Sequence, residues 1–346
     1  MNRKDEHVSL AKAFHKPRSN DFDAVQIIHQ SFPEIDSAQV TLETELFGRS
    51  FATPFFINAM TGGSEKSKKI NQDLAEIAKA CDLMMATGSV SAALKDPALS
   101  DTFQVVRQVN PEGFLLANVG AGSSVENALR AIDLFEADAL QIHLNAPQEL
   151  VMPEGDRAFS NWLSLIEQIV QVSPVPVVVK EVGFGMTRET IQQLVSVGVQ
   201  TIDVAGSGGT SFTQIENARR KKREMAYLDH FGQSTVISLL EANEVQQPFT
   251  TIASGGVRDA FDIFKALCLG AKSVGISATI LTMLLDKGPA ETIATIQSWK
   301  EQLQLLYTMV GQTRTQDLTN VPLVFSGSVK DWCQARQISL SDYSFR

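Results

Sequence analysis

One pattern occurs eight times along this chain: a short apolar run ends in small, polar or glycine residues, and a helix-like stretch follows. In Pro54–Gly63, which reads PFFINAMTGG, the apolar run ends at Asn58, and Thr61 and a glycine pair follow. A parallel strand that is covered on both faces reads as a nearly continuous apolar run. Glycines after such a strand let the backbone approach a ligand closely. The predicted strands are Pro54–Met60, Met84–Ser91, Phe114–Gly122, Ala139–Asn145, Val175–Gly183, Thr201–Gly209, Phe249–Gly256 and Ser273–Ser277.

The stretches between these strands have helical periodicity. Strands that alternate with periodic helices indicate βα units and parallel pairing. Eight such units over about 230 residues predict an α/β fold with one (β/α)₈ barrel, whose chemistry belongs to the loops after the strands. A doubly wound open sheet is the competing fold, but no dinucleotide-binding glycine fingerprint follows the first strand. The predicted helices are Ser67–Ala80, Asp101–Val109, Ser124–Phe135, Asn161–Val172, Arg188–Val197, Ser234–Ala242, Asp259–Leu267 and Ala278–Leu285.

Length and composition agree with one globular domain over residues 1–346, of which 44% are hydrophobic and 20% charged. We expect the barrel over about 54–286, an N-terminal arm over 1–53 and a helical C-terminal extension over 287–346. A net charge of −9 argues against nucleic acid or an anionic membrane as the main partner. The polar start MNRKDEHVSL and the lack of a long apolar run predict a cytoplasmic protein. The three cysteines match no zinc or disulfide pattern.

Three strand ends predict a phosphate site. Ser254–Asp259 (SGGVRD) follows the seventh strand, and Ser277–Thr279 follows the eighth; each precedes a helix. Helix N-termini offer backbone N–H groups and the positive end of a dipole to phosphate, and the loops after strands seven and eight are the common phosphate site of barrels. Ala205–Ser211 (AGSGGTS), after the sixth strand, adds further backbone amides.

Lys180 ends the fifth strand, where an unpaired ammonium group is costly to bury. Three roles are open for it: contact with the electron-rich edge of a flavin, a Schiff base, or a structural ion pair with Glu181. We favour a flavin because other strand ends carry the amide and hydroxyl groups that an isoalloxazine ring needs. These residues are Asn58, Thr61, Ser89, Asn118 and Thr210.

The fourth strand gives the sharpest indication of a substrate site. Gln141, His143 and Asn145 have period-two spacing and so share one face of the strand. Just beyond the strand, Glu149 could bind Mg²⁺, because this ion is commonly held by one or two carboxylates together with phosphate oxygens of the substrate. The basic run at residues 219–223 is interpreted as a solvated stretch, although the long connection around it, Ser211–Gln233, favours a mobile lid.

Taken in order, several motifs closely resemble those of the type 2 isopentenyl diphosphate isomerases, which are FMN-dependent barrels, and the resemblance covers nearly the full length. The motifs are RKDEH at 3–7, NAMTGG at 58–63, ATGS at 86–89, HLNAPQE at 143–149, PEGDR at 153–157, Lys180, SGGT at 207–210 and GGVRD at 255–259. By position, the resemblance implies FMN contacts from Ala59, Met60, Thr61, Ser89, Asn118, Lys180, Thr210, Gly256, Arg258, Ala278 and Thr279. For the substrate it implies Arg3, Lys4, His143, Asn145 and Gln148, and for Mg²⁺ it implies Glu149.

The resemblance also implies an activity: reversible conversion of isopentenyl diphosphate to dimethylallyl diphosphate, with reduced FMN as acid and base and with NADPH or NADH as the reductant. Gln148 would orient the substrate or relay a proton, and His143 would bind the diphosphate. A homo-tetramer or homo-octamer is implied as well. One position departs from the family, because many members carry an arginine where this chain has Ser91. Two alternatives stay open: an oxidoreductase like the FMN-dependent 2-hydroxy acid oxidases, and a non-catalytic flavin-binding barrel.

Overall fold

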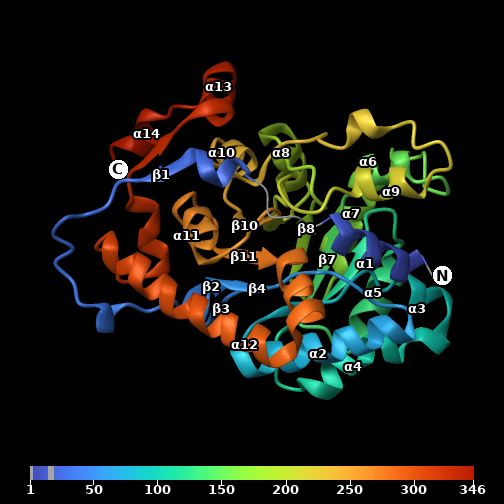
Figure 1. The fold of residues 1–346 in the computed structure, drawn as a ribbon. Helices are drawn as coiled ribbons and strands as arrows, with labels where there is room; N and C mark the ends of the chain where they lie inside the picture. The colour runs from blue at the N-terminus through green and yellow to red at the C-terminus, as the bar shows by residue number, and fades with distance from the viewer. Residues whose placement is uncertain (1–2, 15–18) are drawn as a thin grey trace.

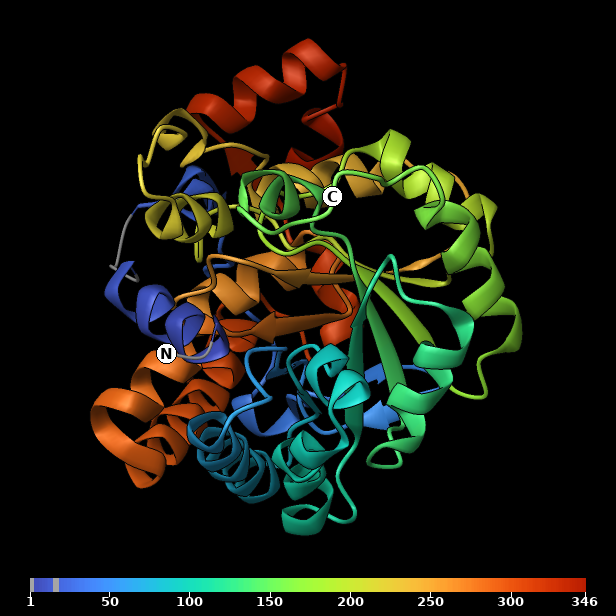
Figure 2. The same cartoon turned by 90° about the vertical axis from the view of Figure 1, so that its right-hand side faces the viewer.

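The computed structural model describes residues 3–14 and 19–346, and of Arg3 and Lys4 only the backbone. Its centre is a closed barrel of eight parallel strands in chain order, in which the last strand pairs with the first (Figures 1 and 2). Every strand lies inside a predicted run, and the last residues of each run lie beyond the strand. The predicted (β/α)₈ barrel is therefore confirmed. The strands are β4 (Phe55–Ile57), β5 (Met85–Ala86), β6 (Leu115–Gly120), β7 (Ala139–His143), β8 (Val177–Lys180), β9 (Thr201–Asp203), β10 (Thr250–Ser254) and β11 (Ser273–Ile276).

Eight helices follow these strands and surround the barrel, as predicted. Side-chain oxygens cap several of them: Ser124, Thr187, Ser234 and Asp259 each accept a backbone N–H of the first turn. The last helix runs beyond its predicted end, although its geometry is broken at Gly288, where φ is 80°. The helices are α2 (Glu65–Cys81), α4 (Asp101–Val109), α5 (Val125–Asp133), α7 (Trp162–Val172), α8 (Arg188–Ser196), α10 (Thr235–Asn243), α11 (Ala260–Cys268) and α12 (Ala278–Met309).

Three short helices lie where sequence analysis placed only strand ends and loops. They are α3 (Ser91–Lys95), α6 (Ala146–Val151) and α9 (Phe212–Arg219). Each lies in the connection after a barrel strand, so the 211–233 connection is partly helical and also contains the 3₁₀ helix η4 (Ala226–Leu228). Helices this short have too few turns for a clear apolar period.

The N-terminal arm and the C-terminal extension pack together on the outside of the barrel, although the first described residues and the C-terminus lie on opposite sides of the molecule (Figure 1). In the arm, β1 (Val25–Ile27) pairs antiparallel with β12 (Leu323–Phe325) of the extension. The extension is therefore not purely helical as expected, because a strand lies between its helices. Of the other elements, η3 (Pro97–Leu99) lies between β5 and α4. The elements outside the barrel units are α1 (Arg3–Phe14), η1 (Asp21–Ala24), η2 (Ser37–Gln39), β2 (Thr44–Leu46), β3 (Arg49–Phe51), η5 (Thr315–Asn320), α13 (Gly327–Arg336) and α14 (Ser341–Ser344).

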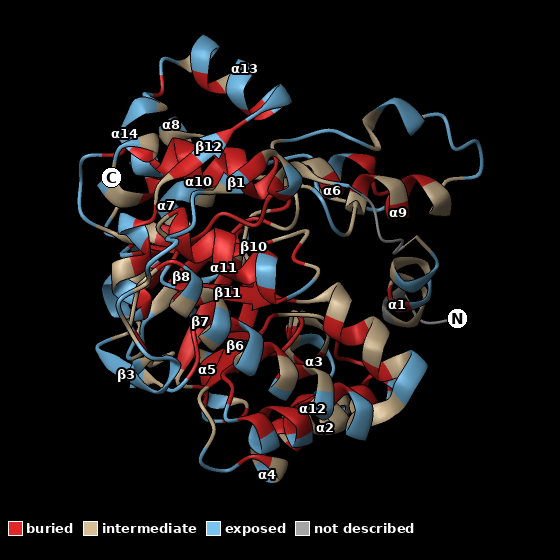
Figure 3. Ribbon diagram, turned by 60° about the vertical axis from the view of Figure 1, so that its left-hand side comes forward, coloured by how far each residue is buried: buried red, intermediate tan, exposed pale blue. Residues whose placement is uncertain are grey.

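The core has two parts, and both are buried (Figure 3). The larger part lies between the strands and the surrounding helices. The smaller part fills the barrel interior with side chains such as Phe56 and Leu116, against which the β2–β3 hairpin packs Phe47. Phe47 stacks on Phe114 with ring centroids 5.4 Å apart. One end of the barrel is thus closed by apolar packing, which leaves the carboxyl ends of the strands for a site.

Two further observations concern the cysteines and the helices. Cys81, Cys268 and Cys333 are buried free thiols. Among the described residues, no helix has both the length and the apolar content needed to cross a membrane.

Candidate active site

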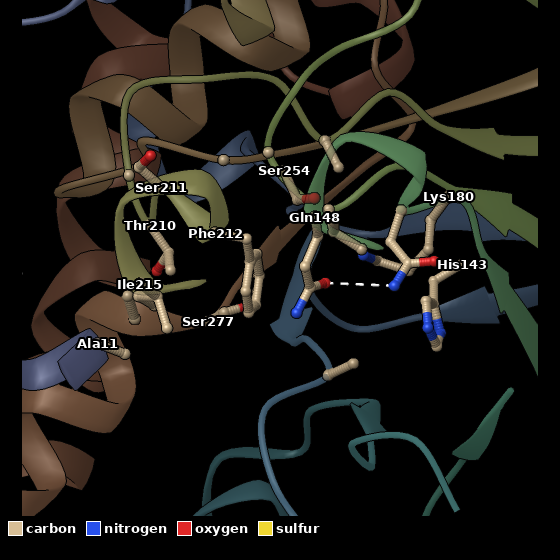
Figure 4. Close-up of a pocket in the computed structure, with 18 of the residues that line it drawn as sticks. Ala11, His143, Gln148, Lys180, Thr210, Ser211, Phe212, Ile215, Ser254 and Ser277 are labelled. Atoms are coloured by element: carbon tan, nitrogen blue, oxygen red, sulfur yellow. Dashed lines mark hydrogen bonds between the residues drawn. The ribbon is translucent and has the colours of Figure 1, made fainter. Parts of the chain in front are cut away.

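A cavity of about 1120 Å³ opens at the carboxyl ends of the strands. Residues from the barrel loops and from α1, α6 and α9 line it (Figure 4). In Figure 4, Phe212 lies between Gln148, His143 and Lys180 on one side and Ala11 and Ile215 on the other. The predicted site residues with described side chains all line this one cavity: Ala59, Met60, Thr61, Ser89, Asn118, His143, Asn145, Gln148, Glu149, Lys180, Thr210, Gly256, Arg258, Ala278 and Thr279. The side chains of Arg3 and Lys4 lie outside the described part.

Two glycine turns form the wall that was predicted to bind phosphate. Gly255 has φ of 94°, and a Cβ there would lie 2.0 Å from the carbonyl oxygen of Gly206, so the two turns meet backbone to backbone. Gly256, with φ of 75°, accepts a hydrogen bond of 2.8 Å from Asn20 of the arm. Thr279, at the start of α12, donates to the Val257 carbonyl oxygen over 2.6 Å. Such a wall of backbone is a concave anion site.

Thr61 tests whether this cavity suits a flavin. Its side chain is only 2% exposed, and its hydroxyl has no hydrogen-bond partner among the described residues. A buried hydroxyl without a partner costs free energy unless a ligand or water satisfies it. Thr61 therefore suits a ligand with ring oxygens and nitrogens at this strand end, as FMN has.

Lys180 lies in the cavity wall beside two buried acids. Its ammonium group donates to the carbonyl oxygen of Glu181 over 2.5 Å, so the suggested ion pair with the Glu181 carboxylate is not formed. That carboxylate instead accepts backbone N–H groups of Val182 and Phe184, and burial raises its pKa to about 7. Burial lowers the pKa of Lys180, which the charges of Asp203 and Glu181 oppose.

Asp203 is a site residue that sequence analysis missed. It ends β9 with no exposed surface, and burial raises the pKa of its carboxyl group against the influence of the Lys180 charge. Its oxygens accept hydrogen bonds from Ser254 at 2.7 and 2.9 Å and from the Ala205 N–H at 3.1 Å. The sequence did contain a signal for Asp203, because a charged residue ends an apolar strand here, as Lys180 does in β8.

A row of hydrogen bonds crosses this end of the barrel from Asp203 to His143. Asn58 donates to Asp203 over 2.9 Å, Gln141 donates to Asn58 over 2.9 Å, and Asn118 donates to Gln141 over 3.0 Å. The Asn118 carbonyl oxygen lies 2.8 Å from Nδ1 of His143. The predicted polar face of the fourth strand is thus one part of a network that four strands and the loop after β4 share.

Glu216, on α9, is a second site residue that sequence analysis missed. It joins the connection after β9 to the N-terminal arm. Its fully buried carboxylate contacts Gln148 Nε2 at 2.9 Å, His7 Nε2 at 3.0 Å and Arg219 Nη1 at 2.5 Å. Burial raises its pKa, but hydrogen bonds from His7 and Gln148 hold the pKa below its usual value. No local pattern marks Glu216, because its contacts come from α1 and α6.

The basic run is exposed at residues 221–223, as expected, whereas Arg219 and Arg220 are partly buried in ion pairs. Arg219 also pairs with Glu6 at 3.2 Å and with Glu154 at 2.5 Å, and its side chain is only 12% exposed. Arg220 pairs with Glu224 at 2.6 Å. Acids of α1, of α9 and of the loop after α6 thus surround Arg219, which holds these segments together.

Two predicted ligand-binding residues already have protein partners. The Glu149 carboxylate accepts hydrogen bonds of 2.9 Å from Asn145 Nδ2 and from the Asp156 N–H. No group of three or more metal-ligating side chains occurs in the described chain, so a metal at Glu149 would need oxygens from a ligand. Arg258 forms ion pairs with Asp23 at 2.6 Å and with Asp262 at 2.7 Å.

Known proteins match this sequence and fold. The profile of the FMN-dependent dehydrogenase family matches residues 137–324. Isopentenyl-diphosphate delta-isomerase of Latilactobacillus sakei subsp. sakei strain 23K is 50% identical over 98% of this chain and 97% of its own length. The enzyme of that name from Listeria monocytogenes serovar 1/2a is 47% identical over 98% of this chain and 95% of its own.

Solved structures share the fold at much lower identity. The flavin-binding domain of baker's yeast flavocytochrome b2 has a TM-score of 0.67 at 16% identity, over 91% of this chain and 81% of that one. A mandelate oxidase variant with an FMN adduct has a TM-score of 0.64 at 15% identity, over 93% and 92%. These likenesses concern the fold, whereas the two curated relatives are similar over nearly the whole sequence. The chain belongs to the type 2, FMN-dependent isopentenyl-diphosphate delta-isomerase family.

Proposed function

We propose that this cavity interconverts isopentenyl diphosphate and dimethylallyl diphosphate with reduced FMN as its cofactor. The observation that carries the proposal is the composition of the cavity. His143 and Gln148 lie on the opposite side of the cavity from the apolar side chain of Ile215, with Phe212 between them (Figure 4), and Asn145 also lines the cavity. A short hydrocarbon chain with a diphosphate needs this combination. Together with the family to which the chain belongs, this combination favours isomerisation of a C5 diphosphate.

The residues that would hold FMN come from most of the strand ends. The glycine turns at Gly206 and Gly255 would bind its phosphate, Thr61 and Asn118 would offer polar groups to its ring, and Lys180 would lie at the electron-rich edge. When bound, reduced FMN would supply the proton and the negative charge that the alkene needs. An alkene is a weak base, so its isomerisation needs a strong acid and not the activated nucleophile that a Ser-His-Asp set provides.

The protein would contribute orientation and exclusion of water. Gln148 is 8% exposed and is held by Asn145 at 3.3 Å and by Glu216 at 2.9 Å, so its amide has a defined orientation toward the cavity. We infer that it orients the hydrocarbon and relays a proton: its oxygen would take a proton from the substrate while its Nε2 hydrogen passes to the Glu216 carboxylate. α1, α6 and α9 enclose the opening and would keep bulk water from the reacting carbons.

The diphosphate needs cations, and the described cavity wall holds few that face it. Arg258 has two carboxylate partners, and Lys180 is buried. Ser91 offers only a hydroxyl, which lies 2.9 Å from that of Ser89. Lys95 lies one turn further along α3 and also lines the cavity. We propose that Lys95, Arg3, Lys4, His143 and Mg²⁺ at Glu149 share the charge of the diphosphate.

The competing oxidase reading is less well supported. It would require a histidine and an unengaged arginine near the seventh strand to remove a proton and hold a carboxylate. Arg258 follows that strand, but its guanidinium group is held by Asp23 and Asp262. His230 does line the cavity, but it comes from the long connection after β9 and not from a strand end.

An anaerobic assay separates the three functions. Reduced, FMN-loaded protein is mixed with Mg²⁺ and isopentenyl diphosphate, and both C5 diphosphates and the reductant are quantified. Isomerisation predicts many turnovers without net consumption of reductant. Bound flavin without turnover would indicate one of the two alternatives. Anaerobic mixing of the oxidised protein with a 2-hydroxy acid then separates them, because an oxidase would reduce its flavin and a non-catalytic barrel would not.

The nicotinamide reductant, the cytoplasmic location and the homo-oligomer remain proposals. For the oligomer, apolar side chains are exposed on the arm and at the end of α12: Phe32 is 86% exposed, and Ile28, Leu305 and Met309 are 42%, 54% and 55% exposed. The backbone of Gln30 bonds to that of Met309, which joins the two segments into one surface. We propose that this surface contacts another copy of the chain. Sedimentation of a Phe32→Asp variant tests it, and an unchanged mass would exclude this surface.

A further inference from the structure

The row of hydrogen bonds between Asp203 and His143 has a direction. Oδ2 of Asp203 accepts from the NH₂ group of Asn58, and the Asn58 oxygen accepts from Gln141 and, over 2.8 Å, from the Ala59 N–H. In the same way, the Gln141 oxygen faces Asn118 and the Asn118 oxygen faces His143. Because a carbonyl oxygen cannot donate, Nδ1 of His143 must carry the hydrogen of the last bond.

We propose that Asp203 is a positioning residue that sets the tautomer and the ring orientation of His143 from the other side of the barrel. Asp203, Asn58, Gln141 and Asn118 are at most 3% exposed, so water cannot replace a broken bond. Turning the amide of Gln141 or Asn118 over would break two bonds and turning that of Asn58 would break three, and each buried group left unpaired costs about 1 to 3 kcal/mol. The row therefore holds one orientation along its whole length.

The tautomer decides which nitrogen of His143 serves the cavity. With Nδ1 protonated and held by Asn118, the neutral ring has its lone pair on Nε2. Nε2 is then the atom that gains a proton and becomes a cationic donor. A reversed row would leave Nδ1 as an acceptor and put the only hydrogen on Nε2. The link to diphosphate binding rests on the proposed function, whereas the tautomer itself does not.

Asp203 could have a simpler role, which is to balance the charge of Lys180. A variant of Glu181 tests this simpler role, because Glu181 is the other acid beside Lys180. Both acids are buried, and both contribute to the pKa of Lys180. Only Asp203 belongs to the row, since the Glu181 carboxylate bonds to backbone N–H groups. Glu181→Gln thus removes a charge beside Lys180 without touching the row.

Asp203→Asn should break the row at Asn58. The Ala205 N–H donates to Oδ1 of Asp203, while Asn58 donates to Oδ2. In the variant, the carbonyl oxygen would stay with Ala205, so the new NH₂ group would face the NH₂ group of Asn58. Two donors cannot pair, and the direction of the row is lost.

The test is ¹⁵N NMR of FMN-loaded protein with labelled histidine, in which the loss of signals in His143→Gln assigns His143. The unaltered protein and Glu181→Gln should show a protonated Nδ1 and an unprotonated Nε2 above the titration of the ring. Asp203→Asn should lose that pattern, and so should Gln141→Met, which cuts the row while keeping Asp203. The proposal is overturned if both row variants keep the pattern, or if Glu181→Gln loses it.

Kinetics add a second measurement. Asp203→Asn should raise KM for the C5 diphosphate several-fold with a smaller change in kcat, whereas Glu181→Gln should not raise KM. If the tautomer of His143 changes while KM stays the same, the inferred role of His143 in diphosphate binding is refuted. If the unaltered protein shows no isomerisation, the proposed function fails while the NMR result still decides the row. If Asp203→Asn does not fold, Gln141→Met alone decides it.

Discussion

Gln148, on α6, donates a hydrogen bond of 2.9 Å to the fully buried carboxylate of Glu216, on α9. The same carboxylate contacts His7 of α1 and Arg219. One side chain thus connects the proposed substrate-orienting amide to the arm and to the connection after β9. Closure over the substrate and orientation of Gln148 should therefore depend on each other.

We predict that Glu216→Gln lowers kcat/KM roughly ten- to hundredfold, because a hydrogen bond to a charged group is worth about 1.5 to 3 kcal/mol. FMN content should stay the same, since Glu216 is not among the FMN contacts inferred by position. Glu154→Gln is the matched control, because Glu154 contacts Arg219 from a side chain that is 44% exposed. Steady-state assays compare the two variants, and equal effects would contradict a special role for Glu216.

Lys180→Met should weaken FMN binding at least roughly tenfold while the fold stays intact. The variant removes a buried cation that faces the cavity and keeps most of the side-chain volume. Titration of the apoprotein with FMN, followed by flavin fluorescence, measures the affinity, and circular dichroism checks the fold. Unchanged affinity would show that Lys180 does not contact the flavin.

The barrel was predictable because its signals are local. An apolar run between turn residues marks each strand, and Lys180 stands out as a charge at the end of such a run. Asp203 carries the same signal but was interpreted as part of its strand, since a single acid shows no partner in sequence. The pairing of β1 with β12 joins residues about 300 positions apart and has no local signature. Glu216 was missed for the same reason, because its role comes from contacts with α1 and α6.

Glu149→Gln should raise the Mg²⁺ concentration that half-activates the enzyme, while the flavin content stays the same. The carboxylate is the one metal-ligating group proposed here, and an amide oxygen is a weaker ligand for a hard cation. Asp156→Asn serves as a control, because only the backbone N–H of Asp156 contacts Glu149. If Glu149→Gln keeps the Mg²⁺ dependence of the unaltered enzyme, the metal does not bind there.

Glu241, on α10, should govern acid stability. Its buried carboxylate accepts hydrogen bonds from Arg188, Arg336 and Trp332, and although burial raises its pKa, these bonds lower it to about 2. A depressed pKa stabilises the fold above the unfolded value near 4.5, and that contribution is lost as the pH falls toward 2.

Glu241→Gln should therefore lower the free energy of unfolding by about 3 kcal/mol at neutral pH. Urea denaturation across pH measures both effects. The difference between Glu241→Gln and the unaltered protein should shrink as the pH falls from 5 toward 2. Glu189→Gln breaks only a largely exposed pair with Arg336 and should cost less than about 1 kcal/mol. A difference that stays constant with pH would mean that the Glu241 charge is not the cause.

The last prediction separates the charges at the start of the chain from the docking of its first helix. α1 is anchored next to the cavity by three consecutive residues: Asp5 accepts from Ser64 over 2.6 Å, Glu6 pairs with Arg219, and His7 contacts Glu216. Arg3 and Lys4 directly precede these anchors in the sequence, and we propose that they bind the diphosphate.

Changing both Arg3 and Lys4 to Met should raise KM for the C5 diphosphate at least roughly tenfold and leave the thermal midpoint unchanged, because the anchors remain. Deleting residues 1–7 should raise KM as well, but it should also lower the midpoint by a few degrees and reduce kcat, since Arg219 and Glu216 lose partners from the arm. Steady-state kinetics and calorimetry on the two proteins measure these effects. If the double variant keeps its kcat/KM while the deletion loses it, the arm acts by closing the cavity, and the diphosphate is held by other cations.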